Sequence, residues 1–262
     1  AIDVVVDPAN PTKVIAAMWE RQRREDYIKY GGRNSGIYIS TNSGDTWAQP
    51  GGGFPMNDVN LGRVSLDISR SNPQVIYALA AATSGSSRGL YKTTNGGTNW
   101  TLQTSGTTTW LSAVCFSDNY TGWNVGAFGI ILKTTNGGTN WTTQTSGTTN
   151  VLWSVDFTDN STGWTVGGGG TILRTANGGT NWTAIPTAGV SLELFCIWAL
   201  DENTAFVGNG GSAGGQGGNA IFYKTTNAGV SWTQVGATGG SLGFFNGIVF
   251  SRSNPSFGIA QS

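Results

Sequence analysis

The charged side chains of this chain gather in one short stretch, which is where recognition chemistry is expected first. The chain has 14 basic and 14 acidic residues among 262, and no histidine. Residues 20–33 contain the largest group: Glu20, Arg21, Arg23, Arg24, Glu25, Asp26, Lys29 and Arg33. Arginine forks onto carboxylate or sulfate groups, and binding residues concentrate on loops. We interpret the segment 20–35 as a recognition loop; a solvated, salt-bridged loop is the alternative.

Three tryptophans are candidates for stacking on a sugar ring. Trp19 precedes the charged loop, and Trp110 and Trp153 each stand at the start of an apolar strand pattern. Ordinary packing of at least two of them is the alternative interpretation. The predicted ligand-binding set is Trp19, Glu20, Arg21, Arg23, Arg24, Trp110 and Trp153.

Catalytic chemistry has few candidates. Without histidine there is no Ser-His or Cys-His nucleophile and no histidine-based metal site. Glycoside hydrolysis needs two facing carboxyl groups, and spacing alone does not pair any of Glu20, Glu25, Asp26, Asp58 and Glu193. The stretch 208–215 is glycine-rich but has no Lys-Ser/Thr ending and no following helix, so it predicts a hairpin loop. We predict no catalytic residue, metal or cofactor.

Bulk composition restricts the class of partner. The net charge is zero and no basic stripe is present, which argues against nucleic acid. No apolar run reaches the roughly 18 residues of a membrane span. Protein or carbohydrate remains as the expected partner, with the oligomeric state open. Cys115 and Cys196 fall in different strand patterns and are predicted to be buried free thiols. The Gly-, Thr- and Ser-rich composition predicts an extracellular or cell-surface protein whose signal peptide is absent or removed.

One eight-residue turn motif occurs five times and predicts the elements that position these residues. The copies are residues 40–47, 93–100, 134–141, 175–182 and 225–232, and their final tryptophans are 53, 41, 41 and 50 residues apart. A period of 40 to 50 residues is the length of a four-stranded propeller blade. The sequence therefore predicts an all-β propeller of antiparallel blades.

We predict a single propeller domain over residues 1–262. Its five complete blades span approximately residues 1–50, 60–105, 110–146, 151–187 and 192–237, and residues 244–262 supply half of a sixth. Because a half blade leaves an unpaired edge, the chain is expected to be a fragment of a six- to eight-bladed ring. Further sequence after Ser262, or a partner chain that completes the blade, is the alternative.

Each motif is a device for folding. The third position offers a side-chain acceptor, the glycine two residues later permits positive φ, and the closing tryptophan packs between sheets. The positions that carry these roles are Asn42, Trp47, Asn95, Trp100, Asn136, Trp141, Asn177, Trp182, Asn227 and Trp232.

These motifs resemble the Asp-box, or BNR, repeat, with Asn in place of the usual Asp. An amide keeps the acceptor oxygen, so a structural role is implied and a catalytic or metal role is not. The blades at 110–187 resemble propeller repeats of photosystem II assembly factors. Residues 18–24 with 31–38 resemble sortilin-type bacterial propellers, and residues 7–11 suit these and the xyloglucan-cleaving glycoside hydrolases. In such relatives the ligand face lies opposite the motif turns, which here implies the loops 20–35, 48–63 and 208–220.

The expected function is a non-enzymatic extracellular module that binds or scaffolds a protein or a glycan. A glycoside hydrolase related to the xyloglucan-cleaving enzymes is one alternative. A structural surface protein that assembles through its incomplete blade is another. Fold alone does not choose among them.

Overall fold

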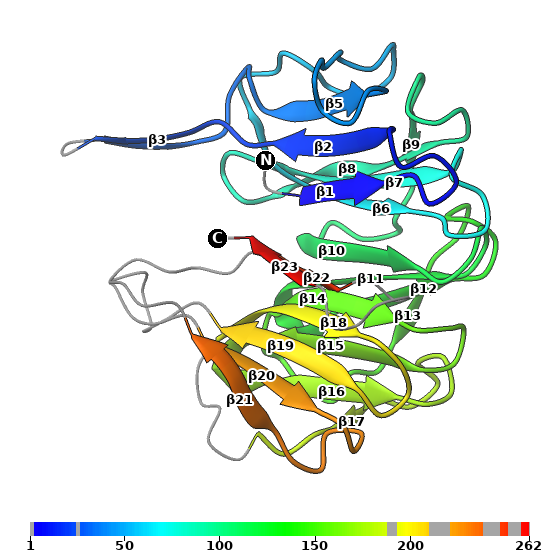
Figure 1. The fold of residues 1–262 in the computed structure, drawn as a ribbon, viewed down its shortest axis with the longest axis vertical. Coiled ribbons are helices and arrows are strands. Elements are labelled where there is room, and N and C mark those ends of the chain that lie inside the picture. The colour runs from blue at the N-terminus through cyan, green and yellow to red at the C-terminus, as the bar shows by residue number, and fades with distance from the viewer. Residues whose placement is uncertain are drawn as a thin grey trace. The chain divides into compact units, whose positions relative to one another are not determined.

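Short antiparallel strands joined by tight turns make up the chain (Figure 1). The structure is a computed structural model that describes residues 3–24, 27–187, 193–209, 221–237, 247–250 and 258–261. Within these ranges the only helical segments are the 3-10 turns η1 (Ala127–Gly129) and η2 (Gly168–Gly170). The residues group into two compact units: unit 1 comprises Ala1–Trp123 with Lys133–Thr142, and unit 2 comprises Asn124–Leu132 with Thr143–Ser262.

Two successive blade sheets lie wholly within unit 1. The first has the order β1 (Asp3–Val6), β2 (Val14–Met18), β5 (Gly36–Ser40). The second has the order β6 (Leu61–Ile68), β7 (Ile76–Ala82), β8 (Ser87–Thr93), β9 (Thr101–Gln103). Four strands were expected in the first blade, but only an isolated bridge between Ile39 and Ala48 stands for the outermost one. Pro50 and the glycines after it follow this bridge at once and leave no strand-forming run there.

Unit 2 repeats the same order. One sheet runs β14 (Leu152–Phe157), β15 (Gly163–Gly167), β16 (Ile172–Thr175), β17 (Thr183–Ala184). The next runs β18 (Leu194–Ala199), β19 (Ala205–Asn209), β20 (Ile221–Thr225), β21 (Thr233–Ala237). Strands β22 (Gly247–Phe250) and β23 (Gly258–Gln261) pair with each other. The predicted glycine loop at 208 begins later than expected, because Gly208 and Asn209 belong to β19; residues 210–220 lie outside the described ranges.

One further sheet draws residues from both units. Its order is β10 (Leu111–Phe116), β11 (Gly122–Gly126), β12 (Ile131–Thr134), β13 (Thr142–Gln144). Four-stranded antiparallel sheets that follow one another along the chain are the blades of a β-propeller. The predicted fold class is confirmed, while the extent of the domain stays a prediction.

The five motif turns form the same hydrogen bonds. In the turn after β12, Asn136 Oδ1 accepts the Asn140 N–H at 2.9 Å, and Thr134 Oγ1 accepts the Gly138 N–H at 3.0 Å. The equivalent asparagines Asn42, Asn95, Asn177 and Asn227 accept at 2.9 to 3.0 Å. The predicted positive φ at the glycine is present, with values of 87° to 98°. The preceding residue also has positive φ, so Ser43 and Ala228 occupy a conformation that favours glycine.

The closing tryptophans differ in burial. Trp100 is 4% exposed and lies in the core of unit 1, and Trp141, Trp182 and Trp232 are half-buried. Trp47 is 43% exposed, so the expectation that each closing tryptophan packs between sheets is wrong for this copy. Later copies contact the preceding sheet, as Trp182 does at Gln144 on β13 and Trp232 does at Trp164 on β15. No sheet precedes the first one along the described chain, and the Trp47 indole N–H donates to Gly44 O within its own turn.

Buried apolar side chains join successive sheets within each unit. In unit 1 the core includes Ile15, Ile37, Leu61, Ile76 and Trp100. In unit 2 an equivalent core forms between the two complete sheets, from residues that include Trp164, Ile172, Leu194, Ile197 and Val207. Cys115 and Cys196 are both buried free thiols, as predicted.

Inner-strand carboxylates add hydrogen bonds between neighbouring sheets. Asp3 accepts the Leu66 N–H at 2.8 Å, Asp67 accepts the Phe116 N–H at 2.5 Å, and Asp156 accepts the Ala199 N–H at 2.7 Å. Burial raises the pKa of Asp3 above its ordinary value, despite these hydrogen bonds and the nearby Arg63. These aspartates therefore hold sheet to sheet.

Candidate functional site

The charged segment predicted to be a loop is instead a β-hairpin. Strand β3 (Arg21–Arg24) pairs with β4 (Tyr27–Tyr30), with Arg21 opposite Tyr30 and Arg24 opposite Tyr27. The pair forms a two-stranded sheet of its own that extends outward from the end of β2 (Figure 1). Because β-branched and aromatic residues favour strands, the run Tyr27-Ile28-Lys29-Tyr30 supplies one strand that the charge count alone concealed.

Glu20 fixes the base of this hairpin. The Glu20 carbonyl accepts the Gly31 N–H at 2.6 Å, and the Glu20 N–H donates to the Oγ of the buried Ser35 at 3.0 Å. Its carboxylate accepts the Asn34 N–H at 3.1 Å. Gly32 donates to Leu61 O at 2.9 Å, which ties the base to β6. Glu20 therefore positions the hairpin rather than offering a free charge.

The backbone at Gly31 requires glycine. Its φ is 98°, and a Cβ there would lie 2.3 Å from Leu61 O. The close approach of the hairpin base to β6 is therefore built from backbone contacts, with no space for a side chain.

Trp19 contacts the base of the hairpin. Its ring stacks on Tyr30, with centroids 5.7 Å apart and planes inclined by 19°. It also packs against the core of unit 1. Tyr30 is 41% exposed, so the outer surface of this stack is aromatic and accessible.

The remaining predicted site residues do not form one cluster. Trp110 is half-buried in unit 1, directly before β10, and Trp153 is half-buried in unit 2 on β14. The structure brings Trp19 and Glu20 together with the backbone of β3. The side chains of Arg21, Arg23 and Arg24 lie outside the described residues, as do Glu25 and Asp26.

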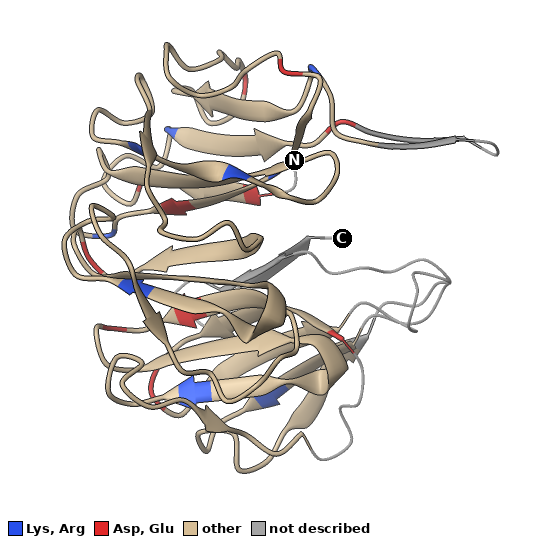
Figure 2. Cartoon of the chain, turned by 180° about the vertical axis from the view of Figure 1, so that it is seen from behind, with Lys and Arg blue, Asp and Glu red and all other residues tan. Residues whose placement is uncertain are grey.

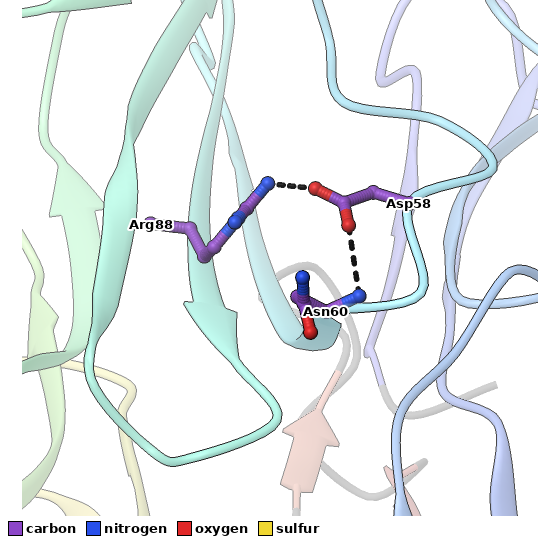
Figure 3. A network of polar contacts seen from close by, with 3 residues as sticks. All are labelled: Asp58, Asn60 and Arg88. Carbon is purple, nitrogen blue, oxygen red and sulfur yellow. Dashed lines mark hydrogen bonds and ion pairs between the residues drawn. The ribbon is translucent and has the colours of Figure 1, made fainter.

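The carboxyl group of Asp58 is engaged in an ion pair. One oxygen contacts the Arg88 guanidinium, and the other accepts the Asn60 N–H at 2.8 Å (Figure 3). Arg88 stands on β8, so the pair links the loop before β6 to the start of β8. Charged groups are sparse elsewhere in the described part (Figure 2). The described residues bring together no cluster of three potential metal ligands.

A repeated cation contact escaped sequence reasoning. Lys92, Lys133, Arg174 and Lys224 each lie 5.3 Å from the centroid of a second-strand ring, respectively Tyr77, Trp123, Trp164 and Phe206. Burial lowers the pKa of Lys92 and Lys133. The signal in the sequence is a Lys or Arg directly before the first residue of each of the last four motifs. These four cations serve packing.

Comparisons with known proteins agree with this fold. The sequence profile of the photosystem II assembly factor YCF48 matches residues 140–239. No curated protein sequence matches the chain significantly. None of the described helical segments is long or apolar enough to cross a membrane.

Two solved GH74 structures show the same architecture, and a YCF48 structure is also similar. The GH74 enzyme of Niastella koreensis has a TM-score of 0.70 at 18% identity, over 97% of this chain and 42% of that one. The GH74 xyloglucanase of Xanthomonas campestris has a TM-score of 0.66 at 11% identity, over 99% of this chain and 43% of that one. YCF48 bound to D1 peptide has a TM-score of 0.47 at 26% identity, over 57% of this chain and 46% of that one.

This chain spans less than half the length of each of these three solved chains. At these low sequence identities, the similarity to the two GH74 enzymes shows the fold alone. The repeated turns, the sheet order and the profile match agree: the chain is a BNR-type β-propeller that resembles the photosystem II assembly factors.

Proposed function

We propose that this chain is a non-catalytic, extracellular or cell-surface propeller module that binds another protein. The observation that carries the proposal is the β3–β4 hairpin. It is fixed at its base by Glu20 and Gly31, and its own strands pair only with each other among the described residues. Four of its residues are Arg or Lys: Arg21, Arg23, Arg24 and Lys29. A basic arm held at a rigid base suits an acidic partner surface.

The profile match supports a protein as partner. YCF48 is named as an assembly factor, and the matched residues 140–239 include the two complete sheets of unit 2. The hairpin lies outside the matched region, so it distinguishes this chain from what the profile describes. A two-stranded hairpin alone is only marginally stable in water; a partner that adds contacts to it would stabilise its conformation.

The state of the carboxyl groups supports a role without catalysis. Glu20 and Asp58, two of the candidates for a hydrolytic pair, accept hydrogen bonds within unit 1. A carboxyl group committed to positioning backbone is a poor general acid or nucleophile. Incubation with xyloglucan and measurement of reducing ends is expected to give no product above a boiled control, and turnover would overturn this part of the proposal.

The binding role is tested with a random twelve-residue peptide library displayed on phage. Selection on the intact chain is expected to enrich acidic peptides. The double variant Arg23→Ala/Arg24→Ala is expected to bind these peptides about tenfold more weakly, as is typical for the loss of exposed charge pairs worth up to about 1 kcal/mol each. The melting temperature should stay unchanged, since the contacts at the hairpin base come from Glu20, Gly31 and Gly32.

Arg70→Ala is the matched control, because Arg70 is exposed and lies outside the hairpin. It should bind the selected peptides as the wild type does. Equal binding by the double variant and the wild type, or enrichment of peptides without acidic residues, would reject the hairpin as the binding element.

A further inference from the structure

Two β-bulges on the inner strands of unit 2 alter the direction of aromatic side chains. The pairing of β14 with β15 skips Trp153, and the pairing of β18 with β19 skips Phe195. Bulges are common next to binding sites, where the extra residue re-aims a side chain. The two skipped residues contact each other, with ring centroids 5.4 Å apart and planes inclined by 40°. Both are half-buried, so each ring keeps some accessible surface.

An exposed carboxylate stands just before the second of these bulged strands. Glu193 directly precedes β18, and its Oε1 would lie 3.9 Å from a Cβ built on Gly168. Phe195 follows two residues later, which is about 7 Å along an extended strand. Glu193 forms no hydrogen bond or ion pair within the described part of the chain, in contrast to Glu20 and Asp58.

The turn next to Glu193 has no side chains of its own. Turn η2 consists of three glycines, and Gly169 has φ 62° and ψ 26°. In η1, 41 residues earlier, the same conformation is occupied by Phe128, whose side chain is 79% exposed. At η2 the corresponding residue, Gly169, carries no side chain, and a Cβ there would lie 3.4 Å from Asn150 Nδ2.

Turn η2 is also held in place. Asn150 Nδ2 donates to Gly168 O at 3.2 Å and to Thr171 Oγ1 at 2.8 Å. The Gly168 N–H donates to Val151 O at 2.9 Å. The turn beside Glu193 is therefore preorganised, which reduces the entropic cost of binding.

We propose that Glu193, Trp153 and Phe195 form a subsite for an arginine side chain of a partner protein. The carboxylate accepts two guanidinium N–H groups, and the planar cation or its apolar stem packs on the exposed ring surface. Glu193 and Phe195 are two residues apart along the chain, which is about 7 Å in an extended strand, and an arginine side chain is long enough to reach from one to the other. The inference rests on the proposed function, because the arginine belongs to a bound protein.

The probe is a capped tripeptide, N-acetyl-glycyl-arginyl-glycinamide, titrated into the ¹⁵N-labelled chain and followed by NMR at low salt. The same peptide with citrulline in place of arginine keeps the shape and removes the charge. Saturable shifts of the Trp153 indole N–H are expected with the arginine peptide, with at least tenfold weaker binding of the citrulline peptide. High salt should weaken only the first.

Glu193→Gln is expected to reduce affinity for the arginine peptide to that for the citrulline peptide. Glu202→Gln is the control, since Glu202 is an exposed glutamate of the same unit that lies in the β18–β19 turn. It should leave binding unchanged. Absence of saturable shifts, equal binding of the two peptides, or equal binding by Glu193→Gln and the wild type would each overturn the subsite.

The hairpin proposal and the subsite proposal can be rejected independently. Arg23→Ala/Arg24→Ala is expected to bind the arginine tripeptide as the wild type does, because the hairpin belongs to unit 1. Failure of the hairpin test with retention of tripeptide binding would reject the hairpin alone. Failure of the tripeptide test with retention of acidic-peptide binding would reject the subsite alone.

Discussion

Asn124 is a buried polar side chain that destabilises the sheet in which it stands. It stands on β11 with no exposed surface, and neither its amide nitrogen nor its amide oxygen has a hydrogen-bond partner in the described part of the chain. An unsatisfied buried polar group costs about 1–3 kcal/mol. The equivalent position, 41 residues later on β15, is Thr165. It is also fully buried, and its hydroxyl donates to Ser154 O at 2.9 Å.

Asn124→Thr is therefore expected to stabilise the chain by about 1 kcal/mol. The urea midpoint should rise with an unchanged slope. The reverse exchange, Thr165→Asn, is the control and should lower the midpoint. A fall in stability for Asn124→Thr would show that the amide has a partner other than the described residues.

Asp159 gives stability a dependence on pH. Burial alone would raise its pKa, but N–H bonds from Thr162 and Ser161 at 2.8 and 2.6 Å and the Thr158 hydroxyl outweigh burial, so the pKa is lowered. A lowered folded-state pKa contributes stability that is present above the unfolded value of about 3.9 and is lost as pH falls through the folded value.

Asp159→Asn should accordingly destabilise the chain at pH 7 and have little effect near pH 2, where the wild-type carboxyl group is also neutral. Urea unfolding at a series of pH values measures this difference. A destabilisation of equal size at both pH values would mean that the charge of Asp159 is not the cause. Asp118→Asn is a parallel test, because Asp118 accepts the N–H groups of Tyr120 and Thr121 in the same way.

At the scale of the element, the motif turn depends on an acceptor and not on a charge. In the turn after β12, Asn136 Oδ1 accepts the Asn140 N–H and the Thr134 hydroxyl, at 2.9 and 3.0 Å. Either an amide or a carboxylate oxygen can do both. The Asn that distinguishes these turns from the usual Asp-box therefore preserves the geometry.

Asn136→Ala is expected to cost about 1–2 kcal/mol, since it removes two hydrogen bonds of about 1 kcal/mol each. Asn136→Asp should change stability by less than about 0.5 kcal/mol. Thermal unfolding of both variants beside the wild type measures the contrast. Equal losses for the two variants would show that the amide nitrogen, not the oxygen, is what the turn needs.

At the scale of the whole molecule, the repeat period was sufficient to predict the sheets. The 41-residue offset carries β10–β13 onto β14–β17, since the motif turns and the strand segments recur at the same spacing. The roles of the motif glycines and asparagines can also be predicted from the sequence, because these roles depend on neighbours within the same turn.

The sites were less predictable, because they depend on departures from the repeat. The residue types of β14 and β18 do not reveal the bulges at Trp153 and Phe195, so the contact between the two rings could not be predicted from the sequence. The many charged residues of the hairpin predict a loop, because its strand-forming residues are confined to the short run Tyr27–Tyr30. The role of Glu20 depends on Asn34 and Ser35, which approach it only after the hairpin has formed.

The locality of the motif turn has a consequence for how the chain acquires its structure. All of its side-chain acceptor bonds close within five residues, as in Thr134 to Gly138 and Asn136 to Asn140. Short-range contacts of this kind form within microseconds, before distant strands meet. Each turn can therefore serve as an independent nucleus for its own hairpin. During synthesis, the hairpin of one repeat can form before the next repeat has emerged.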